Sequence, residues 1–421
     1  MAKRLHVAVV SQFFWPEMGA PAARWHDFGK LLVERGHRVT VLTGLPNSPT
    51  GVVPEAYRRR VALREEIDGI TVLRGWLYAS PRLSAATKSL GFASFALSAS
   101  AQALLRRLDA DVVIATSPPP TVGVPGIVAA RRLGVPLVFD VRDLWPEAIA
   151  SSGRLRSGLL IRTLTALADT IYRQAAAITV VTEGKRERLI EEGVPAEKVV
   201  VIPNGVDLGR FLDVPPLEAE ELRALGFDPE RFLVLYAGIM NPPQGLDVLL
   251  DAIQRLAARR PDLATRVQLG LVGGGSERER LEARVRAERL DGLVRFAPVQ
   301  PRERIPPLLR AAGAITVPLR PRRDTHTVPS KLYEAMASGR PVLVSADGAP
   351  NEILREAEAG LATPAADAEA LADSIETLLT KPALAQELGA NGVRYARRFD
   401  RRALVDELER LLLAVTERAR R

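Results

Sequence analysis

The sequence predicts an α/β protein built on two doubly wound, mostly parallel sheets. Three observations support this. Residues 6–44 read as a buried strand, a loop, a helix and a second strand, which is the opening unit of such a sheet. A new series of strands and helices begins at residues 231–238. The chain has 421 residues, which is enough for two or three domains that each bury a core.

The composition is that of a soluble globular protein, with 47% hydrophobic and 26% charged residues. The absence of cysteine excludes disulfides, cysteine zinc sites and thiol nucleophiles, and four histidines disfavour a histidine-built metal site. No signal-peptide pattern and no run of 18 apolar residues occur in the sequence. We therefore expect a cytoplasmic protein without a membrane-spanning helix.

The net charge of +8, from 58 basic and 50 acidic side chains, favours an anionic partner. Such a partner would be a nucleic acid, a phosphate-bearing substrate or an anionic membrane. An arginine-rich genome composition explains the same excess equally well. The chain lacks low-complexity tails and aromatics interleaved with basic residues, so we do not expect a nucleic acid.

The loop at residues 13–24 follows the first strand and leads into a helix that ends at Gly36. Ligands of doubly wound sheets bind beyond the carboxyl ends of the strands, so this loop should border the binding site. Gly19 allows the backbone to approach a ligand, and Arg24 is placed to meet a negative charge. An ordinary connecting loop is the alternative. Without a G-x-G-x-x-G pattern, no dinucleotide cofactor is expected.

Residues 82–108 have a helical pattern that is unusually apolar for its length. Phe92, Phe95 and Leu97 alternate with small residues, and Lys and Arg residues flank the segment. An apolar helix with basic flanks can lie in a membrane interface, where anionic lipids attract its basic side chains. A core helix of the first domain is an equally good interpretation.

Residues 136–147 read as a buried strand followed by a loop that carries Asp143, Trp145 and Glu147. We regard Asp143 and Glu147 as candidate catalytic residues, because a carboxylate at a strand end can orient or deprotonate a substrate hydroxyl. The alternative is a structural contact between Asp143 and Arg142 beside a packed Trp145.

Glycine turns follow the first two strands of the second series. The strand at residues 231–238 ends on Gly238, and residues 267–281 read as a strand, a turn with Gly273 and Gly274, and a helix. Glycines at these points permit close approach of the backbone to a ligand. The second turn lacks the G-K-[ST] sequence of a P-loop.

Residues 326–346 form the most informative stretch, which reads as a loop, a helix and a buried strand. We expect Ser330 to cap the helix and Gly339 to end it. Lys331 and Glu334 share one face of its first turn. A helix start beside Lys331 suits a phosphate, and Glu334 can accept hydrogen bonds from sugar hydroxyls. The alternative is a solvated Lys–Glu pair on a surface helix.

With these motifs the chain resembles glycosyltransferase family 4 over essentially its whole length, and it is similar to the WbuB-type N-acetyl-fucosamine transferases of O-antigen and surface-polysaccharide synthesis. The D-L-W-P-E run at residues 143–147 matches that subgroup, and P-N-G-V-D at 203–207 matches the family's inter-domain crossing. The resemblance implies a GT-B fold. It has two Rossmann-like domains, residues 1–206 and 207–395, which face a cleft, and a C-terminal helix, 396–421, that crosses back to the first domain.

The resemblance also assigns site residues. The second Glu of the family's E-x7-E element, which holds the donor ribose, falls on Glu334, and the first falls on His326. The Arg and Lys that clamp the donor diphosphate fall on Ile239 and Gln244, so Lys331 and arginines of the preceding loop would replace them. The implied donor-binding residues are Glu334, Lys331, Ser330, Gly19, Gly238, Gln244, Gly273, Gly274, Arg320 with Arg322 or Arg323, and Val299 at the strand end where the family reads the nucleobase. The candidate catalytic residues are Asp143, Glu147 and His326.

The activity implied by the resemblance is transfer of an N-acetylated deoxyhexose or a hexosamine from a UDP-sugar to a hydroxyl of a lipid-linked saccharide. It proceeds with retention at the anomeric carbon and without a metal or another cofactor. The implied partners are the nucleotide sugar, a polyprenyl-diphosphate-linked acceptor and the anionic inner face of the cytoplasmic membrane, on which the protein would be peripheral. Two alternatives remain open: a UDP-N-acetylhexosamine epimerase on the same fold, and a non-catalytic anion-binding protein.

Overall fold

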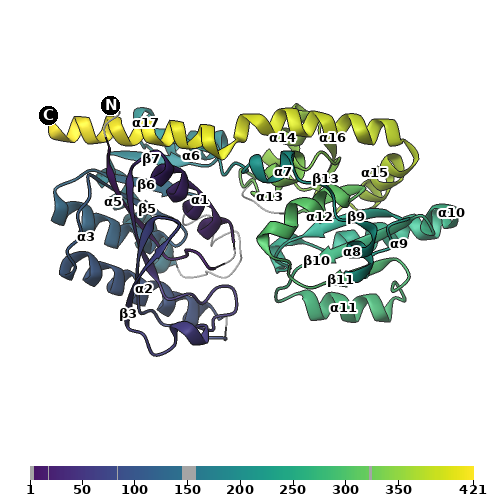
Figure 1. Cartoon of the computed structure of the whole chain (residues 1–421), viewed down its shortest axis with the longest axis horizontal. Helices are drawn as coiled ribbons and strands as arrows, with labels where there is room; N and C mark the ends of the chain where they lie inside the picture. Colours follow the sequence, from purple (N-terminus) through teal and green to yellow (C-terminus); the bar gives the residue numbers. More distant parts are fainter. Residues whose placement is uncertain (1–3, 18, 83, 145–157, 322–324) are drawn as a thin grey trace. The chain divides into compact units, whose positions relative to one another are not determined.

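The computed structural model of the chain describes residues 4–17, 19–82, 84–144, 158–321 and 325–421 (Figure 1). The chain forms two compact units. The first unit combines Met1–Asn204 with Arg401–Arg421, and the second unit is Gly205–Asp400.

The first unit is built on a sheet with the strand order β3-β4-β2-β1-β5-β6-β7-β8. All neighbouring strands are parallel except β3 and β4. The chain winds outward from β1 in both directions, so the point between β1 and β5 is the switch point at which such sheets bind ligands. The strands are β1 (His6–Ser11), β2 (Arg38–Gly44), β3 (Ala62–Ile67), β4 (Ile70–Gly75), β5 (Val112–Thr116), β6 (Leu137–Val141), β7 (Ala177–Val180) and β8 (Val199–Val201).

The antiparallel strand β3 was missed by the sequence analysis. It forms a hairpin with β4, and Asp68 and Gly69 make its turn, both with positive φ. Asp-Gly is a common pair in such turns, so a local signal existed. The strand was hidden because its side chains alternate only between exposed and half-buried positions and include Arg64, Glu65 and Glu66.

Helices cover the sheet of the first unit, and the long helix α2 packs on α3 and on the β2 and β4 strands. Its inner side chains Phe95, Ala99 and Ala103 are part of the core, so the core interpretation holds for this side of the helix. Within the described ranges, no helix combines the length and apolar character that crossing a bilayer requires. The helices are α1 (Ala20–Glu34), α2 (Ala85–Leu105), α3 (Gly123–Leu133), α5 (Gly158–Gln174), α6 (Glu183–Glu191) and α17 (Arg401–Arg420), with short 3-10 helices η1 (Glu55–Tyr57), η2 (Pro120–Val122) and η3 (Ala196–Lys198).

The last helix, α17, belongs to the first unit, and Figure 1 shows it lying against α1. Leu404, Leu408 and Leu412 recur every four residues and join the core that contains β1. Three ion pairs along the helix also hold it to the first unit: Arg401–Asp27, Arg35–Glu409 and Arg420–Asp111.

The second unit has a parallel sheet with the order β11-β10-β9-β12-β13-β14. The predicted doubly wound α/β class is therefore confirmed for both units. The strands are β9 (Phe232–Ala237), β10 (Val267–Val272), β11 (Val294–Ala297), β12 (Ala314–Pro318), β13 (Val342–Ser345) and β14 (Gly360–Thr363). The helices are α7 (Gly209–Leu212), α8 (Ala219–Ala224), α9 (Asp247–Arg259), α10 (Pro261–Ala264), α11 (Arg278–Ala287), α12 (Ile305–Ala311), α13 (Lys331–Ala337), α14 (Ala349–Ala357), α15 (Ala368–Thr380) and α16 (Pro382–Ala396), with η4 (Pro242–Gln244), η5 (Arg302–Arg304) and η6 (Arg397–Phe399).

Candidate functional site

Two glycine turns lie backbone against backbone at the carboxyl ends of β9 and β10. The N–H of Gly238 donates to the Val272 carbonyl (2.9 Å), and that of Met240 donates to the Gly274 carbonyl (2.7 Å). Gly273 has a φ of 138°, and a Cβ at this position would lie 2.0 Å from the carbonyl oxygen of Gly238. Only glycine fits there, so this edge of the sheet presents backbone rather than side chains.

The amino group of Lys331 lies beside these turns, 2.9 Å from where a Cβ on Gly238 would be. Its Nζ donates to Oε1 of Gln244 (2.8 Å) and to the hydroxyl oxygen of Tyr236 (2.9 Å), and it lies 4.2 Å from the Tyr236 ring centroid. The structure thus brings together Lys331, Gln244 and Gly238 from the predicted donor-binding set. Tyr236 was missed, because a tyrosine within an apolar strand reads as core.

Both hydrogen-bond partners of Lys331 are neutral. Among the residues that the structure describes, no carboxylate forms an ion pair with it. Part of the side chain is accessible, but protein atoms crowd the amino group. This burial lowers the pKa of Lys331 to about 7, and the charge of Glu334 acts in the opposite direction. A buried cation without an ion-pair partner is suited to an anion from outside the chain.

The helix α13 that begins at Lys331 spans seven residues, Lys331–Ala337, so its macrodipole adds little to the charge of the lysine. Ser330 occupies the N-cap position, but its side chain caps no amide, and the predicted capping is wrong. The reason is its helical backbone (φ −58°, ψ −30°), whereas capping side chains need extended geometry. Glu334 is half-buried, and its carboxylate has no hydrogen bond or ion pair within the described ranges.

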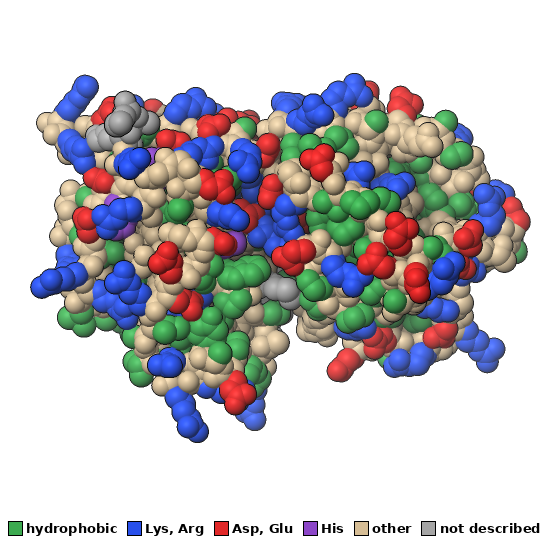
Figure 2. Space-filling view, viewed as in Figure 1, with side chains coloured by type: hydrophobic (Ala, Val, Ile, Leu, Met, Phe, Trp, Pro, Cys, Tyr) green, Lys and Arg blue, Asp and Glu red, His purple; other side chains and the backbone are tan. Residues whose placement is uncertain are grey.

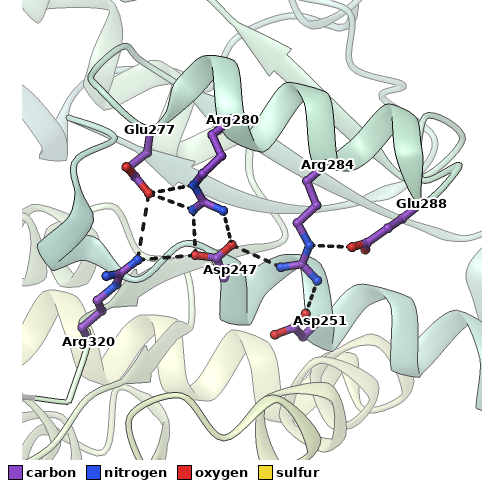
Figure 3. Close-up of polar contacts among 7 residues, drawn as sticks. All are labelled: Asp247, Asp251, Glu277, Arg280, Arg284, Glu288 and Arg320. Atoms are coloured by element: carbon purple, nitrogen blue, oxygen red, sulfur yellow. Dashed lines mark hydrogen bonds and ion pairs between the residues drawn. The ribbon is translucent and has the colours of Figure 1, made fainter.

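Arg320, a predicted donor-binding cation, belongs to a network of arginines and acids centred on α9 and α11 (Figure 3). Its Nη2 lies 3.7 Å from Oδ2 of Asp247 and 3.9 Å from Oε2 of Glu277. Arg280 also binds Asp247, at 2.8 Å, and lowers the pKa of this carboxyl group. A diphosphate would compete with these carboxylates for Arg320, so the donor-binding role of Arg320 stays a prediction.

For the other predicted residues of the second unit, the structure gives a position but no contact that assigns a role. His326 is half-buried in the loop before α13. Val299 is 48% exposed and lies 3.3 Å from where a Cβ on Gly274 would be, so it borders the glycine turn. Arg322 and Arg323 lie outside the described residues.

In the first unit, Gly19 has a φ of 135° at the start of α1, and a Cβ there would meet only Pro21 Cδ, at an ordinary contact distance of 3.8 Å. The glycine is thus required by its backbone conformation. Arg24 was predicted to meet a negative charge, and in the structure that charge belongs to Asp140 of the same unit. Arg24 is buried, donates to the Ile202 carbonyl (2.9 Å) and lies 3.8 Å from Oδ1 of Asp140. Its partners, Ile202 and Asp140, are more than 100 residues away in the sequence, so the sequence did not show that Arg24 would be buried.

Asp143 follows β6, half-buried, and its carboxylate makes no hydrogen bond or ion pair with any described part of the chain. The alternative is therefore wrong, because Asp143 and Arg142 do not form an ion pair. The Arg142 guanidinium instead reaches Oδ1 of Asn204 (3.4 Å), and its Nε and Nη1 are left without partners in the described structure. Glu147 and Trp145 lie outside the described residues.

One buried acid was missed by the sequence analysis. Glu17, in the loop between β1 and α1, is 4% exposed, and its carboxyl group accepts N–H groups of Phe14, Asn47 and Ser48. Burial raises its pKa to about 7, while these donors and Arg74 act in the opposite direction. A glutamate in a loop is normally expected to be exposed to solvent. The signal for burial was its setting in the apolar run FFWPEMG.

The predicted site residues thus divide between the units. Lys331, Gln244 and Gly238 lie together in the second, and Gly19 and Asp143 belong to the first. The cleft expected between the units stays a prediction. Over the described ranges, no group of three His, Cys, Asp or Glu side chains is arranged to hold a metal ion.

Two protein families match the chain. The family described as Glycosyl transferase 4-like domain matches residues 19–205, and the family Glycosyl transferases group 1 matches residues 218–395. Each match lies almost wholly within one of the two units.

Individual relatives agree with these matches. WcaI of Escherichia coli (strain K12), a glycosyl transferase assigned by name to colanic acid biosynthesis, is 27% identical over 338 residues, 79% of this chain and 81% of the relative. A D-inositol 3-phosphate glycosyltransferase of Thermobispora bispora is 30% identical over 307 residues, 70% of this chain and 69% of the relative. The structure of Anabaena HepE in complex with UDP-glucose has a TM-score of 0.71 at 19% identity and covers 98% of this chain and 100% of its own, so the fold is shared over the whole length.

Proposed function

Since the chain belongs to the glycosyltransferases with a 4-like and a group 1 domain, and has their GT-B fold, we propose that it transfers a sugar from a UDP-sugar to a hydroxyl of a lipid-linked saccharide. The bond between the anomeric carbon and the diphosphate oxygen breaks, and UDP leaves with the electron pair. A bond forms between that carbon and the acceptor oxygen, and the hydroxyl proton passes to a base. With the family established, the epimerase and the non-catalytic binder are not retained.

The observation that carries the proposal is the position of the Lys331 amino group beside the glycine turns. Negative charge develops on the diphosphate as the donor bond breaks, and a cation held in place stabilises it. The diphosphate lies along Gly238 and Gly273 and accepts hydrogen bonds from Lys331. The neutral Gln244 stands where the family pattern has a lysine, and its Oε1 is 2.8 Å from Nζ of Lys331. The chain thus supplies the cation to the same place from another element.

Two carboxylates that have no hydrogen-bond or ion-pair partner in the described structure take the remaining roles. Glu334 accepts hydrogen bonds from the ribose hydroxyls, and Asp143 orients or deprotonates the acceptor hydroxyl. His326, Glu147 and the rest of the predicted set stay candidates. The HepE complex with UDP-glucose supports a UDP-sugar donor.

The finer assignment rests on the subgroup motif D-L-W-P-E at residues 143–147. On this basis we place the enzyme with the WbuB-type transferases. Its donor sugar is an N-acetylated deoxyhexose or a hexosamine, and the reaction retains the anomeric configuration. No metal or other cofactor takes part, because Lys331 provides the positive charge at the diphosphate. The naming of WcaI for colanic acid biosynthesis supports a saccharide acceptor.

The proposed acceptor is linked to a polyprenyl diphosphate, which requires contact with the inner face of the cytoplasmic membrane. The outer face of α2 supports this contact. The sequence of α2 has no charged residue between Lys88 and Arg106, and its polar residues in that stretch are serines and Gln102. The exposed positions on this face recur at helical spacing and are all apolar: Ala86, Leu90, Ala93, Leu97, Ala101 and Leu104.

The leucines of this face are large and open to solvent, at 51% for Leu90, 74% for Leu97 and 52% for Leu104. Figure 2 shows hydrophobic side chains gathered on the first unit around α2. Lys88 and Arg106 flank the leucines at either end. The enzyme is therefore peripheral on anionic lipid through this face, with the leucines in the interface.

The proposed function is tested with vesicles that carry polyprenyl-diphosphate N-acetylglucosamine and with a panel of UDP-sugars, by measuring UDP release and sugar transfer. We expect one donor of the panel to release UDP rapidly only when the acceptor is present. A Lys331→Met variant is expected to lose this release. Equal, slow release with and without acceptor across the panel would contradict the proposal, and interconversion of UDP-sugars without acceptor would indicate an epimerase.

A further inference from the structure

The carboxyl group of Glu17 connects two loops of the first unit. Its Oε1 accepts hydrogen bonds from the N–H groups of Asn47 and Ser48, both at 2.8 Å. Its Oε2 accepts one from Phe14 at 3.1 Å. Asn47 and Ser48 follow β2, whereas Phe14 and Glu17 lie between β1 and α1. Nearly the whole side chain is buried, so this contact is part of the interior and not a surface interaction.

A second buried charge joins the same two segments. Arg74, at the end of β4, is fully buried and donates to the carbonyl of Gly44 (3.3 Å) and to the carbonyl of Trp15. It also forms an ion pair with Glu65 of β3. Glu17 therefore accepts from the backbone of both segments, and Arg74 donates to the backbone carbonyls of Trp15 and Gly44.

These loops occupy a functional part of the fold. They follow the carboxyl ends of β1 and β2, next to the switch point between β1 and β5. The loop after β1 also contains Gly19 and leads directly into α1. A shift of this loop would displace the backbone on which a ligand of the first unit rests.

We propose that Glu17 is a positioning residue for the acceptor: its carboxyl group fixes the loop after β1 against the segment after β2 so that the first unit can bind the saccharide end of the acceptor. This inference rests on the proposed function, which assigns the acceptor to the first unit through Asp143. Glu17 does not touch the substrate and acts through the three amides that it holds.

The carboxyl group is chemically suited to this task. Three N–H donors converge on it, and its two oxygens accept all of them. A glutamine offers one oxygen and would place its NH2 group against the N–H of Phe14, and an alanine accepts none. Buried N–H groups left without partners are costly, so the loops would separate until water reached them.

The surroundings of Glu17 give the inference a pH dependence. Arg74 on β4 is a charged group that acts on Glu17. Its guanidinium pairs with Glu65 of β3 and lies over the ring of Tyr57 of η1, and His26 of α1 stacks on Trp15 of the same loop as Glu17. Burial raises the pKa of Glu17 from 4.5 to about 7, so proton binding favours the joined loops over loops with a solvated Glu17. The joined arrangement therefore weakens as the pH rises toward 7.

The test compares Glu17→Gln and Glu17→Ala with Glu55→Gln, a control that alters an exposed glutamate of η1. The KM for polyprenyl-diphosphate N-acetylglucosamine is measured with the donor saturating, and the Kd for the accepted UDP-sugar by calorimetry. We expect the acceptor KM to rise about tenfold in Glu17→Gln and further in Glu17→Ala, since one and three hydrogen bonds are lost, while the donor Kd changes less than twofold. The wild-type acceptor KM should rise between pH 5 and about 7, and that of Glu17→Gln should not.

Two results would overturn the inference: an unchanged acceptor KM in a Glu17 variant whose Tm has fallen, or a parallel rise of the acceptor KM and the donor Kd. If neither variant folds, hydrogen exchange in the wild type decides. Slower exchange at Asn47 and Ser48 when the acceptor is bound supports the positioning role, and unchanged exchange refutes it. If the wild type binds no UDP-sugar, the proposed function is contradicted. The inference about Glu17 then falls as well, because it rests on that function.

Discussion

Lys331 is a lysine whose amino group is surrounded by neutral oxygens, an aromatic ring and bare backbone. Lysines of this kind lose their proton more easily than exposed ones, because burial disfavours the charged form. Here the pKa is lowered to about 7, so a modest external influence decides whether the group is charged. An arriving diphosphate would supply that influence, and the lysine would reach full charge only in the complex.

This arrangement predicts a pH-dependent donor affinity. The free protein loses the Lys331 proton as the pH rises through about 7, whereas bound diphosphate favours the charged form. A proton is therefore taken up on binding, and affinity should fall by up to about tenfold per pH unit above 7. Calorimetry of UDP-N-acetylglucosamine binding between pH 6 and 8.5, in buffers of different ionisation enthalpy, measures both effects. A wild-type profile as flat as that of Lys331→Met would contradict it.

Because Lys331 and Gln244 are in contact, the positive charge can be transferred from residue 331 to residue 244 by exchanging the two side chains. Lys331→Gln should weaken UDP-N-acetylglucosamine binding by about 1.5–3 kcal/mol, or about 10–100-fold, because a charge-assisted hydrogen bond is lost. Adding Gln244→Lys brings an ammonium back to the same place and should recover most of this affinity. Arg286→Gln, which removes an exposed cation of the second unit, is the control. If Lys331→Gln binds like the wild type, the assigned role is wrong.

Among the helices, α2 illustrates how one segment serves two environments. Its inner side fills the core of the first unit, while its outer side exposes a row of leucines and alanines. The sequence analysis gave a core helix and an interfacial helix as alternatives. The structure supports the core helix for the inner face, and the outer face can still be interfacial. A helix with almost no charged residues does not show from its sequence which side is covered.

The outer face predicts binding to anionic vesicles. Replacing Leu90, Leu97 and Leu104 by Gln should remove about 1 kcal/mol of transfer free energy each, which lowers partitioning about 100-fold in total. Folding should persist, since these side chains point away from the core. Co-sedimentation with vesicles containing phosphatidylglycerol measures the effect, and Leu212→Gln, an exposed leucine of the second unit, is the control. Equal sedimentation of the triple variant and the wild type would exclude this face.

Most strands of both sheets could be predicted because continuous apolar runs such as HVAVVS are typical of buried parallel strands. The strand β14 was not predicted, since its sequence GLAT is short and mostly half-buried. The β3 strand could not be predicted either, because an exposed edge strand has no apolar run to reveal it. The start of α13 was predicted correctly, but the capping by Ser330 was not. Capping depends on one backbone angle, which neighbouring packing sets and the sequence does not display.

For the molecule as a whole, each unit carries its own part of the predicted site. The sequence analysis named Lys331 and Gln244 as candidates, and the family resemblance implied that Lys331 replaces a missing lysine. The meeting of their side chains with Tyr236 needed the fold, since residue 236 is 95 positions away from Lys331. The partners of Arg24 needed the fold as well, because its carbonyl partner Ile202 is 178 residues away.

The central claim is that the second unit binds the nucleotide of a UDP-sugar between Lys331 and Glu334. The most direct measurement is calorimetric binding of UDP-N-acetylglucosamine to the wild type, to Glu334→Ala and to the control Glu279→Ala, which changes an exposed glutamate of α11. Loss of the ribose hydrogen bonds should weaken binding about 10–100-fold in Glu334→Ala alone, with an unchanged Tm. A Kd for Glu334→Ala equal to that of the wild type would contradict the claim.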